Sequence, residues 1–241
     1  MGVPWASGPG EILKHGISLL KKDSDTNRRL AMISIDNAVE LMIKTYLGLP
    51  NRITGLKIPR KELQEISESF PQLLDALEKY ASEKIVGINL GEIEWYHRLR
   101  NELYHQGNGL TVEKDKINVY AELSNLLFEN LFGEKLIESN ELSINLLGDF
   151  MSAWISYEKV VKPFPYGNKG KSFHYINTPE ILNKNSAISN NELTKINNIK
   201  EIRNKVVHGL VNPEDVITTE IIEYIKEITK RIIDNKDKWN P

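Results

Sequence analysis

The amino-acid sequence predicts an all-α fold, and three observations lead to this prediction. Apolar residues recur at spacings of three and four along most of the 241 residues, which is the period of a helix buried on one face. Residues that cap or stop helices separate these periodic segments. No segment has the alternation of apolar and polar residues that is typical of strands. We therefore expect bundles of helices.

The first two predicted helices open the chain. A short one covers residues 12–20, and a longer one has Ser24 or Asp25 as its N-cap and ends near Leu47, before the sequence Gly-Leu-Pro. The apolar residues expected to be buried on the longer helix are Leu30, Ile33, Val39, Leu41, Met42 and Tyr46.

Three more helices are expected before the middle of the chain. One covers residues 60–82 with a break at Pro71, and the next covers residues 90–105. The fifth carries the apolar stripe Ile117, Tyr120, Leu123, Leu127 and Leu131. Gly133 and the polar residues 138–140 are then expected to link two domains, in residues 1–135 and 136–241.

The second half of the sequence predicts fewer helices. A helix at residues 141–161 carries Leu147, Met151 and Trp154, and a loop rich in Pro, Gly, Lys and aromatic residues follows at 162–177. A short helix after Pro179 and a longer one at 191–208 come next. The last helix has Asn212 as its N-cap and the stripe Ile217, Ile221, Ile225, Ile228 and Ile232.

The composition excludes several classes of protein. Without cysteine there is no disulfide, no thiolate metal site and no cysteine nucleophile. A formal net charge of −2 argues against a general polyanion binder, so any contact with nucleic acid must be local. No metal motif, P-loop or dinucleotide motif is present, so we expect neither a metal ion nor another cofactor. We expect a cytoplasmic protein, because no apolar run reaches membrane-spanning length and no signal-peptide pattern is visible.

The pattern Arg-Asn-x-x-x-His occurs twice, at 100–105 and at 203–208. Each copy ends a predicted helix, and a glycine follows shortly as a stop signal, Gly107 in the first copy and Gly209 in the second. An amphipathic helix closes each half after its copy. The sequence therefore has a weak internal repeat of about 100 residues.

The spacing within the pattern has a chemical interpretation. Asn and His four residues apart share one face of a helix, and the long Arg side chain can swing onto it. Arginine binds a phosphate through two N–H groups, histidine transfers protons near neutral pH, and asparagine orients either partner. Such a set suits cleavage of RNA by its own 2′-hydroxyl without a metal. The alternative is that both motifs merely cap helix carbonyls.

These segments resemble the HEPN superfamily (higher eukaryote and prokaryote nucleotide-binding domains). The resemblance rests on RNELYHQGNGL at 100–110, IRNKVVHG at 202–209 and RRLAMISIDNAVELMIKTYL at 28–47. It implies two HEPN-like helix bundles packed as a pseudo-dimer, the second one shorter. It also implies a metal-independent endoribonuclease whose two motifs face each other in one composite cleft. The implied catalytic residues are Arg100, Asn101, His105, Arg203, Asn204 and His208.

The resemblance also implies partners. RNA is the expected substrate, with single-stranded loops as one form of it, and an antitoxin or other regulatory partner and a homodimer are implied as well. Many members act as toxins or in abortive-infection and antiphage defence. Some relatives only bind nucleotides, RNA or proteins, and this non-catalytic module is the alternative to a nuclease.

Further residues are expected to contact the substrate. Tyr104 and Lys205 lie inside the motifs, and the loop at 162–177 offers Tyr166, Lys169 and Lys171 for stacking on bases and contacts to phosphates. The alternative for that loop, which we favour, is an ordinary surface loop whose aromatic residues fold back onto the bundle.

Four polar residues in the first half remain open. Asp36, Glu40 and Lys44 follow one another at spacings of four, which predicts a surface ion pair rather than an acid in the cleft. His97 either lines the cleft or is simply exposed, and we favour exposure.

Overall fold

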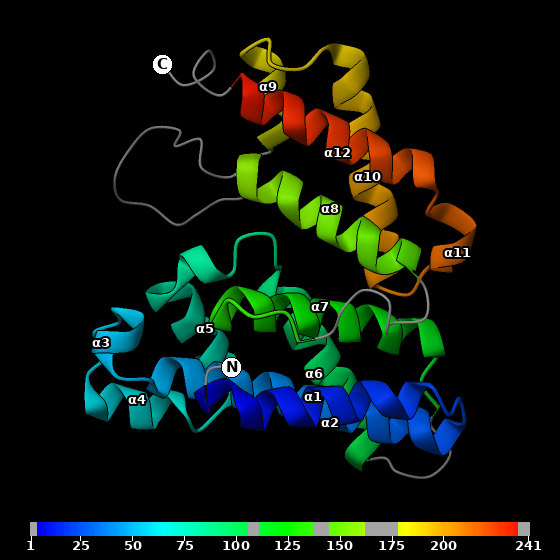
Figure 1. Cartoon of the computed structure of the whole chain (residues 1–241). Coiled ribbons are helices and arrows are strands. Elements are labelled where there is room, and N and C mark those ends of the chain that lie inside the picture. Colours follow the sequence, from blue (N-terminus) through cyan, green and yellow to red (C-terminus); the bar gives the residue numbers. More distant parts are fainter. Residues whose placement is uncertain (1–3, 106–110, 137–144, 162–177, 236–241) are drawn as a thin grey trace. The chain divides into compact units, whose positions relative to one another are not determined.

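The computed structural model describes residues 4–105, 111–136, 145–161 and 178–235 (Figure 1). Within these ranges the chain forms twelve α-helices and two short 3-10 helices and no strand, so the all-α prediction is confirmed. Every helix in the same ranges is too short or too polar to span a lipid bilayer. The chain divides into two compact units, Met1–Asn145 (unit 1) and Leu146–Pro241 (unit 2), each described by itself below.

Unit 1 contains the first seven α-helices. Their bounds, with those of the 3-10 helices, are η1 Pro4–Ala6, α1 Ser7–Leu20, α2 Asp25–Gly48, α3 Asn51–Thr54, α4 Arg60–Ile66, α5 Phe70–Tyr80, η2 Ser82–Lys84, α6 Leu90–His105 and α7 Lys114–Phe132. The predicted break before Pro71 is confirmed, because α4 ends four residues before α5 begins.

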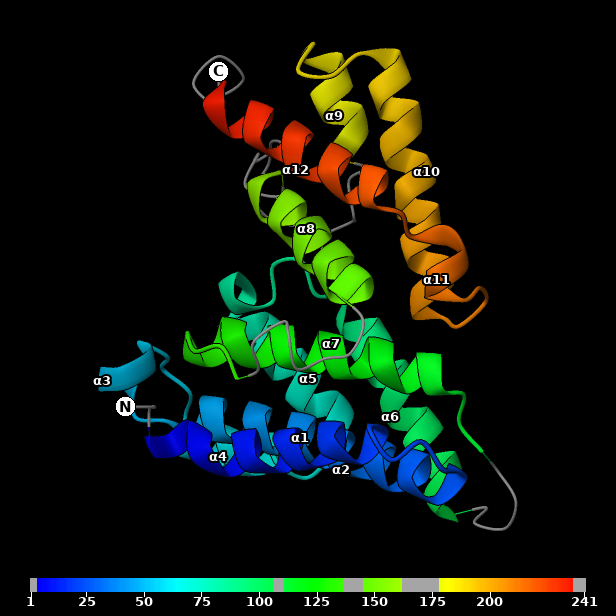
Figure 2. The same ribbon diagram turned by 45° about the vertical axis from the view of Figure 1, so that its right-hand side comes forward.

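Helix α2 is the centre of unit 1. It packs against α1, α5, α6 and α7, and Figures 1 and 2 show α1 and α2 side by side. The hydroxyl of Ser24 accepts a hydrogen bond from the backbone N–H of Asn27 and caps the helix, as predicted. Gly16 lets α1 approach closely, because a Cβ there would lie 2.9 Å from Cγ1 of Ile35.

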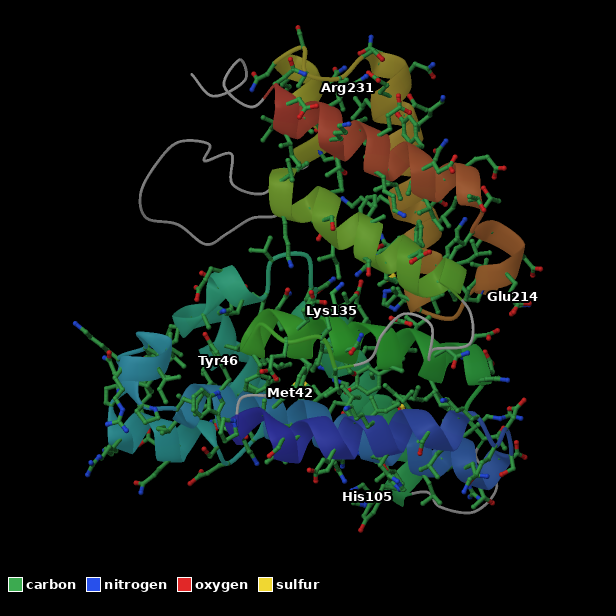
Figure 3. All side chains as sticks on the ribbon, in the orientation of Figure 1. Met42, Tyr46, His105, Lys135, Glu214 and Arg231 are labelled. Carbon is green, nitrogen blue, oxygen red and sulfur yellow. The ribbon has the colours of Figure 1, made fainter. Side chains whose placement is uncertain are left out.

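The prediction of the buried face of α2 is wrong in part. Val39, Met42 and Tyr46 are buried, and Figure 3 shows Met42 and Tyr46 within unit 1. Leu30 and Leu41, however, are 46% and 37% exposed. At 100° per residue both lie about 180–200° around the helix from Val39, so they cannot share its buried face. Polar Asp36 takes an inward position instead, at 0% exposure.

Helix α7 follows its predicted pattern. All five residues of its expected stripe, namely Ile117, Tyr120, Leu123, Leu127 and Leu131, are buried. Its N-terminal half thereby packs Tyr120 toward α2 and α6, and this tyrosine takes part in the site described below.

Unit 2 contains α8 Asn145–Val161, α9 Thr178–Lys184, α10 Asn190–Val207, α11 Pro213–Val216 and α12 Thr219–Asp234. The predicted single last helix is wrong, because it is split into α11 and α12. Ile217 has an extended backbone between them, and the hydroxyl of Thr218 accepts from the N–H of Ile221 to start α12. Threonine favours an extended backbone and its hydroxyl can cap a helix, so Thr218 ends the first helix and begins a new one.

A charged contact joins the two long helices that close unit 2. Ser189 and Glu192 form a capping box at the start of α10. Glu192 also accepts a hydrogen bond from Arg231 near the end of α12, with 2.6 Å between Oε1 and a terminal nitrogen. This bond, followed by those from Ser189, lowers the pKa of Glu192 to about 2, although partial burial opposes the shift.

We expect Glu192→Gln to destabilise the protein at pH 7 and to leave its acid stability unchanged. Because the pKa of Glu192 is lowered in the fold to about 2, its carboxylate stabilises the folded state above the unfolded pKa of about 4.3. That stabilisation disappears as the pH falls toward 2. Urea denaturation should show a loss of about 1 kcal/mol at pH 7, discounted for solvent screening, and no difference near pH 2.

The matched control is Glu201→Gln on the same helix. Glu201 pairs with Lys205 at 2.8 Å, but both side chains are largely exposed. We expect little change in stability, because solvent screens this exposed pair. Equal effects of the two substitutions at pH 7 would contradict a special role for the contact between α10 and α12.

Candidate functional site

The guanidinium of Arg100, on α6, is held against α2. Its Nε donates to Oδ2 of Asp36 at 2.6 Å, and one terminal nitrogen donates to Oδ1 of Asn101 at 2.8 Å. The other terminal nitrogen lies 3.4 Å from Oδ1 of Asn37 and 3.8 Å from Oε2 of Glu40. The side chain of Arg100 is only 16% exposed. The arginine of the first motif is therefore anchored, and does not swing freely around α6.

Asp36 joins three helices through one carboxylate. It is fully buried and accepts hydrogen bonds from Arg100 on α6 and from the hydroxyl of Tyr120 on α7, the latter at 2.8 Å. Nδ1 of His97 lies 3.0 and 3.2 Å from its two oxygens. The prediction of a surface ion pair is wrong for Asp36, because its helix position points inward. It holds for Glu40, which pairs with Lys44 at 2.6 Å.

His97 is not the exposed residue that we favoured. Its side chain is 14% exposed, and its ring stacks on Phe70 with 3.9 Å between centroids and 8° between planes. The aromatic residue that begins α5 covers one face of the imidazole, and Asp36 holds one edge. His15, by contrast, is exposed on α1.

Tyr120 is a fixed donor in this cluster. Burial, and next the negative charge of Asp36, raise the pKa of Tyr120 well above its ordinary value. The phenol therefore keeps its proton and donates a hydrogen bond to the carboxylate. Its ring stacks on Tyr96 of α6 at 4.4 Å between centroids, which adds an apolar contact to the polar one.

The histidine of the first motif is exposed to solvent. His105 is the last residue of α6 and is exposed, and Figure 3 shows it at the margin of unit 1. Tyr104 is 64% exposed, and its ring meets that of His105 edge to face at 5.4 Å. The first motif thus combines an anchored guanidinium with an imidazole and a phenol that solvent reaches.

The second motif likewise combines a buried arginine with an exposed histidine. Arg203 on α10 is 4% exposed, and its guanidinium reaches Oδ1 of Asn204 at 3.5 Å. His208 follows the last residue of α10 and is exposed. Lys205, expected to contact substrate, is engaged by Glu201 at 2.8 Å.

Gly209 confirms the predicted helix stop. It has a φ of 62°, which favours glycine, and its N–H donates to the carbonyl of Val206. The N–H of Leu210 donates to the carbonyl of Lys205, which completes a Schellman motif. His208 is fixed at the open end of α10 by this turn.

The structure brings together some of the predicted site residues. Arginine and asparagine contact each other within each motif, and both histidines are exposed. The two motifs belong to different units, so the composite cleft stays a prediction. Gly107, Tyr166, Lys169 and Lys171 lie outside the described residues. Within the described ranges no group of three or more histidine and carboxylate side chains is arranged to hold a metal ion.

The Arg-Asn-x-x-x-His pattern does not point to Phe70 or Tyr120, and Asp36 was predicted to form a surface ion pair. A signal for burial of Asp36 was available, because it lies three residues after Ile33 and three before Val39 and so shares a helix face with two residues expected to be buried. No local signal marks Phe70 or Tyr120, whose apolar patterns are those of ordinary core residues.

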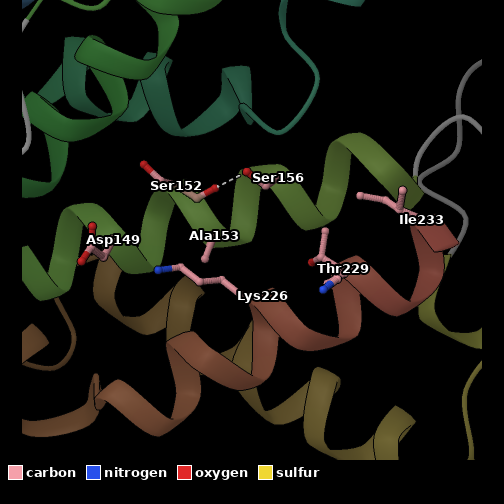
Figure 4. Close-up of a pocket in the computed structure, with 8 residues that line it drawn as sticks. Asp149, Ser152, Ala153, Ser156, Lys226, Thr229 and Ile233 are labelled. Atoms are coloured by element: carbon pink, nitrogen blue, oxygen red, sulfur yellow. Dashed lines mark hydrogen bonds between the residues drawn. The ribbon is translucent and has the colours of Figure 1, made fainter.

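Unit 2 also has a shallow groove between α8 and α12, of about 340 Å³ (Figure 4). Its lining residues are Asp149, Ser152, Ala153, Ser156, Lys226, Thr229, Lys230 and Ile233. The two lysines are exposed, one helical turn apart, and the hydroxyl of Ser156 donates to the carbonyl of Ser152 at 2.8 Å. The groove therefore offers positive charge beside a partly apolar floor.

Comparisons with known proteins give no family. No family model matches the sequence, no curated protein matches it, and no solved structure matches the fold.

We expect Asp36→Asn to destabilise unit 1 strongly. The substitution removes the charge that compensates the buried guanidinium of Arg100, and breaking a buried pair from one side costs about 3–5 kcal/mol. Urea denaturation of the whole chain, followed by circular dichroism, should show a loss of about 3 kcal/mol or more.

Two neighbouring substitutions serve as controls. Tyr120→Phe removes one hydrogen bond to Asp36 and should cost about 1 kcal/mol. Glu40→Gln weakens a longer contact near the surface and should cost less than about 1 kcal/mol. An Asp36→Asn variant as stable as the wild type would show that the buried carboxylate is not what holds α6 against α2.

Proposed function

We propose that this chain is a metal-independent, HEPN-like endoribonuclease. The observation that carries the proposal is the repeated Arg-Asn-x-x-x-His arrangement. In each copy the arginine side chain is largely buried, and the histidine is exposed at the C-terminal end of a helix. If the motifs only capped helix carbonyls, a buried arginine next to each exposed histidine would not be needed.

The proposed chemistry is attack of the RNA 2′-hydroxyl on the adjacent phosphate. One imidazole accepts the proton of the hydroxyl, and O2′ forms a bond to phosphorus while the bond from phosphorus to O5′ breaks. An imidazolium donates a proton to O5′. The products are a 2′,3′-cyclic phosphate and a 5′-hydroxyl, and no metal takes part in these steps.

The arginines of this proposal act from fixed positions. Arg100 uses its Nε toward Asp36 and one N–H toward Asn101, and a guanidinium has five N–H groups. The contacts to Asn37 and Glu40 are long, so N–H groups remain for an oxygen of the phosphate. Because the guanidinium is already ordered, it loses little side-chain freedom when a phosphate binds.

The biological setting follows from the same proposal. We infer a cytoplasmic effector that cleaves RNA, of the kind that acts as a toxin or in antiphage defence, with an antitoxin or regulatory partner. The two motifs form the cleft either within one chain or across a homodimer. Tyr104 is the side chain next to His105 that is open for stacking on a base.

We expect purified wild-type protein to cleave single-stranded RNA in the presence of EDTA, and His105→Ala, His208→Ala or both to lose that activity. Removing a general acid or base lowers the rate about 10²–10⁴-fold. Gel electrophoresis gives the rates, and enzymatic end analysis of the fragments should show cyclic phosphate and 5′-hydroxyl ends.

His15→Ala is the matched control, because His15 is an exposed histidine of unit 1 outside both motifs. It should cleave at the wild-type rate. If His105→Ala and His208→Ala also cleave at that rate, the imidazoles have no part in the reaction and the proposed mechanism is wrong.

A second candidate is a module that binds RNA without cleaving it. The groove of unit 2 favours this function, because Lys226 and Lys230 carry no ion pair among the described residues and lie about 6 Å apart along α12. That spacing allows two contacts to neighbouring phosphates of one strand. A binding module predicts affinity without turnover.

We expect the double variant Lys226→Gln, Lys230→Gln to bind a single-stranded RNA more weakly and with a smaller salt dependence. Loss of two phosphate contacts reduces the slope of log affinity against log salt by about 1.4. Fluorescence anisotropy over a range of salt concentrations measures it. The double variant Lys21→Gln, Lys22→Gln, with exposed lysines on unit 1, is the control, and equal slopes for both variants would exclude the groove.

A further inference from the structure

We propose that His97 is the proton acceptor of the first motif, with Nδ1 donating to Asp36 and Nε2 facing the 2′-hydroxyl of the RNA. This inference rests on the proposed ribonuclease function and adds a catalytic residue that the Arg-Asn-x-x-x-His pattern does not contain. The residues that carry it are the buried carboxylate, the stacked ring and the position of His97 on α6.

The hydrogen bonds of Asp36 fix the protonation of the ring. Arg100 donates to one carboxylate oxygen, and a guanidinium has no acceptor. Tyr120 donates to the other, and its raised pKa keeps its proton in place. A carboxylate between these donors is an acceptor, so Nδ1 of His97 at 3.0 Å has to donate. In the neutral ring the lone pair is then on Nε2.

The ring is held in one orientation and still reaches solvent. Phe70 covers one face at 3.9 Å, and Asp36 holds the Nδ1 edge. Nε2 has no hydrogen-bond partner among the described residues. It is not one of the fully buried atoms of those residues that lack a partner, and the His97 side chain is 14% exposed, so Nε2 is accessible to solvent. An imidazole fixed by a carboxylate at one nitrogen and open at the other has the geometry of a general base.

His97 also lies beside the motif on α6. It precedes Arg100 by three residues and Asn101 by four, so all three are neighbours on the helix surface. Together with His105 they cover an arc of about 140° around the helix axis. Arg100 lies at one edge of this arc and His105 at the other, with His97 and Asn101 between them.

The second motif has no such group. The residue three positions before Arg203, which corresponds to His97, is Lys200. A lysine there cannot form the same pair of imidazole and carboxylate. The two motifs are therefore unequal: the first supplies the base, and an open histidine supplies the acid.

The balanced step follows from these roles. Nε2 of His97 takes the proton of the 2′-hydroxyl, O2′ bonds to phosphorus, and the bond from phosphorus to O5′ breaks. O5′ receives its proton from the imidazolium of His105 or His208. The charged and titratable groups around His97 are Asp36 and Glu40 from α2, Arg100 from α6 and Tyr120 from α7, whereas α5 contributes the neutral Phe70.

The test substitution is His97→Asn in the full chain. The amide nitrogen of asparagine replaces Nδ1 and can still donate to Asp36, whereas nothing replaces Nε2. We expect cleavage of single-stranded RNA in EDTA to fall 10²–10⁴-fold in kcat, with KM within about threefold, and the acid limb of the pH–rate profile to disappear. His15→Asn is the matched control and should cleave as the wild type does.

A second measurement does not depend on the variant. In the ¹⁵N-labelled wild-type chain, nuclear magnetic resonance of the His97 ring should show Nδ1 protonated and Nε2 bare in the neutral form. The opposite tautomer overturns the proposal even if His97→Asn fails to fold. A folded His97→Asn variant with wild-type kcat overturns it while the proposed function stands, and a wild-type chain that cleaves no RNA overturns both.

Discussion

One buried carboxylate determines how unit 1 is built around its motif. Asp36 is at the centre of α2, and every one of its close polar contacts comes from another helix, namely α6 and α7. A lone charge in this position would cost several kcal/mol, so the fold depends on Arg100 being close to it. The same contact aims the guanidinium along α2. Stability and the orientation of the site therefore have one cause.

The two units hold the helices that carry their motifs in place by different interactions. In unit 1 a network of polar side chains anchors α6. In unit 2 a capping box of Ser189 and Glu192, with Arg231 paired to Glu192, fixes the N-terminal end of α10, and the Schellman motif at Gly209 fixes its C-terminal end. The polar network of unit 1 fixes the side chains of α6, whereas the caps of unit 2 fix the backbone at the ends of α10. It follows that the second motif is well positioned at His208 but has no counterpart of the oriented imidazole of His97.

Sequence patterns predicted the helices well because periodicity and caps act locally. Ser24 caps α2 through its hydroxyl, Pro71 and Gly209 set helix ends through their backbone preferences, and the apolar stripe of α7 covers only one face of that helix. The inward position of Asp36 was not predictable in the same way. Which face of α2 is buried depends on α5, α6 and α7 together, and the apolar Leu30 and Leu41 pointed to a different face.

The histidines have two kinds of environment, and in the proposed mechanism each kind suits a different role. A ring whose Nδ1–H is bound by a carboxylate has its other nitrogen available to accept a proton, and its tautomer needs no reorganisation when substrate arrives. Rings exposed at the end of a helix are accessible to solvent and substrate, which in the proposed mechanism suits a proton donor. His97 has the first environment, and the exposed ends of α6 and α10 are of the second kind. In the proposed mechanism the base is therefore the ring held by Asp36, which lies outside the Arg-Asn-x-x-x-His motif, and the acid is an exposed ring at the end of a helix.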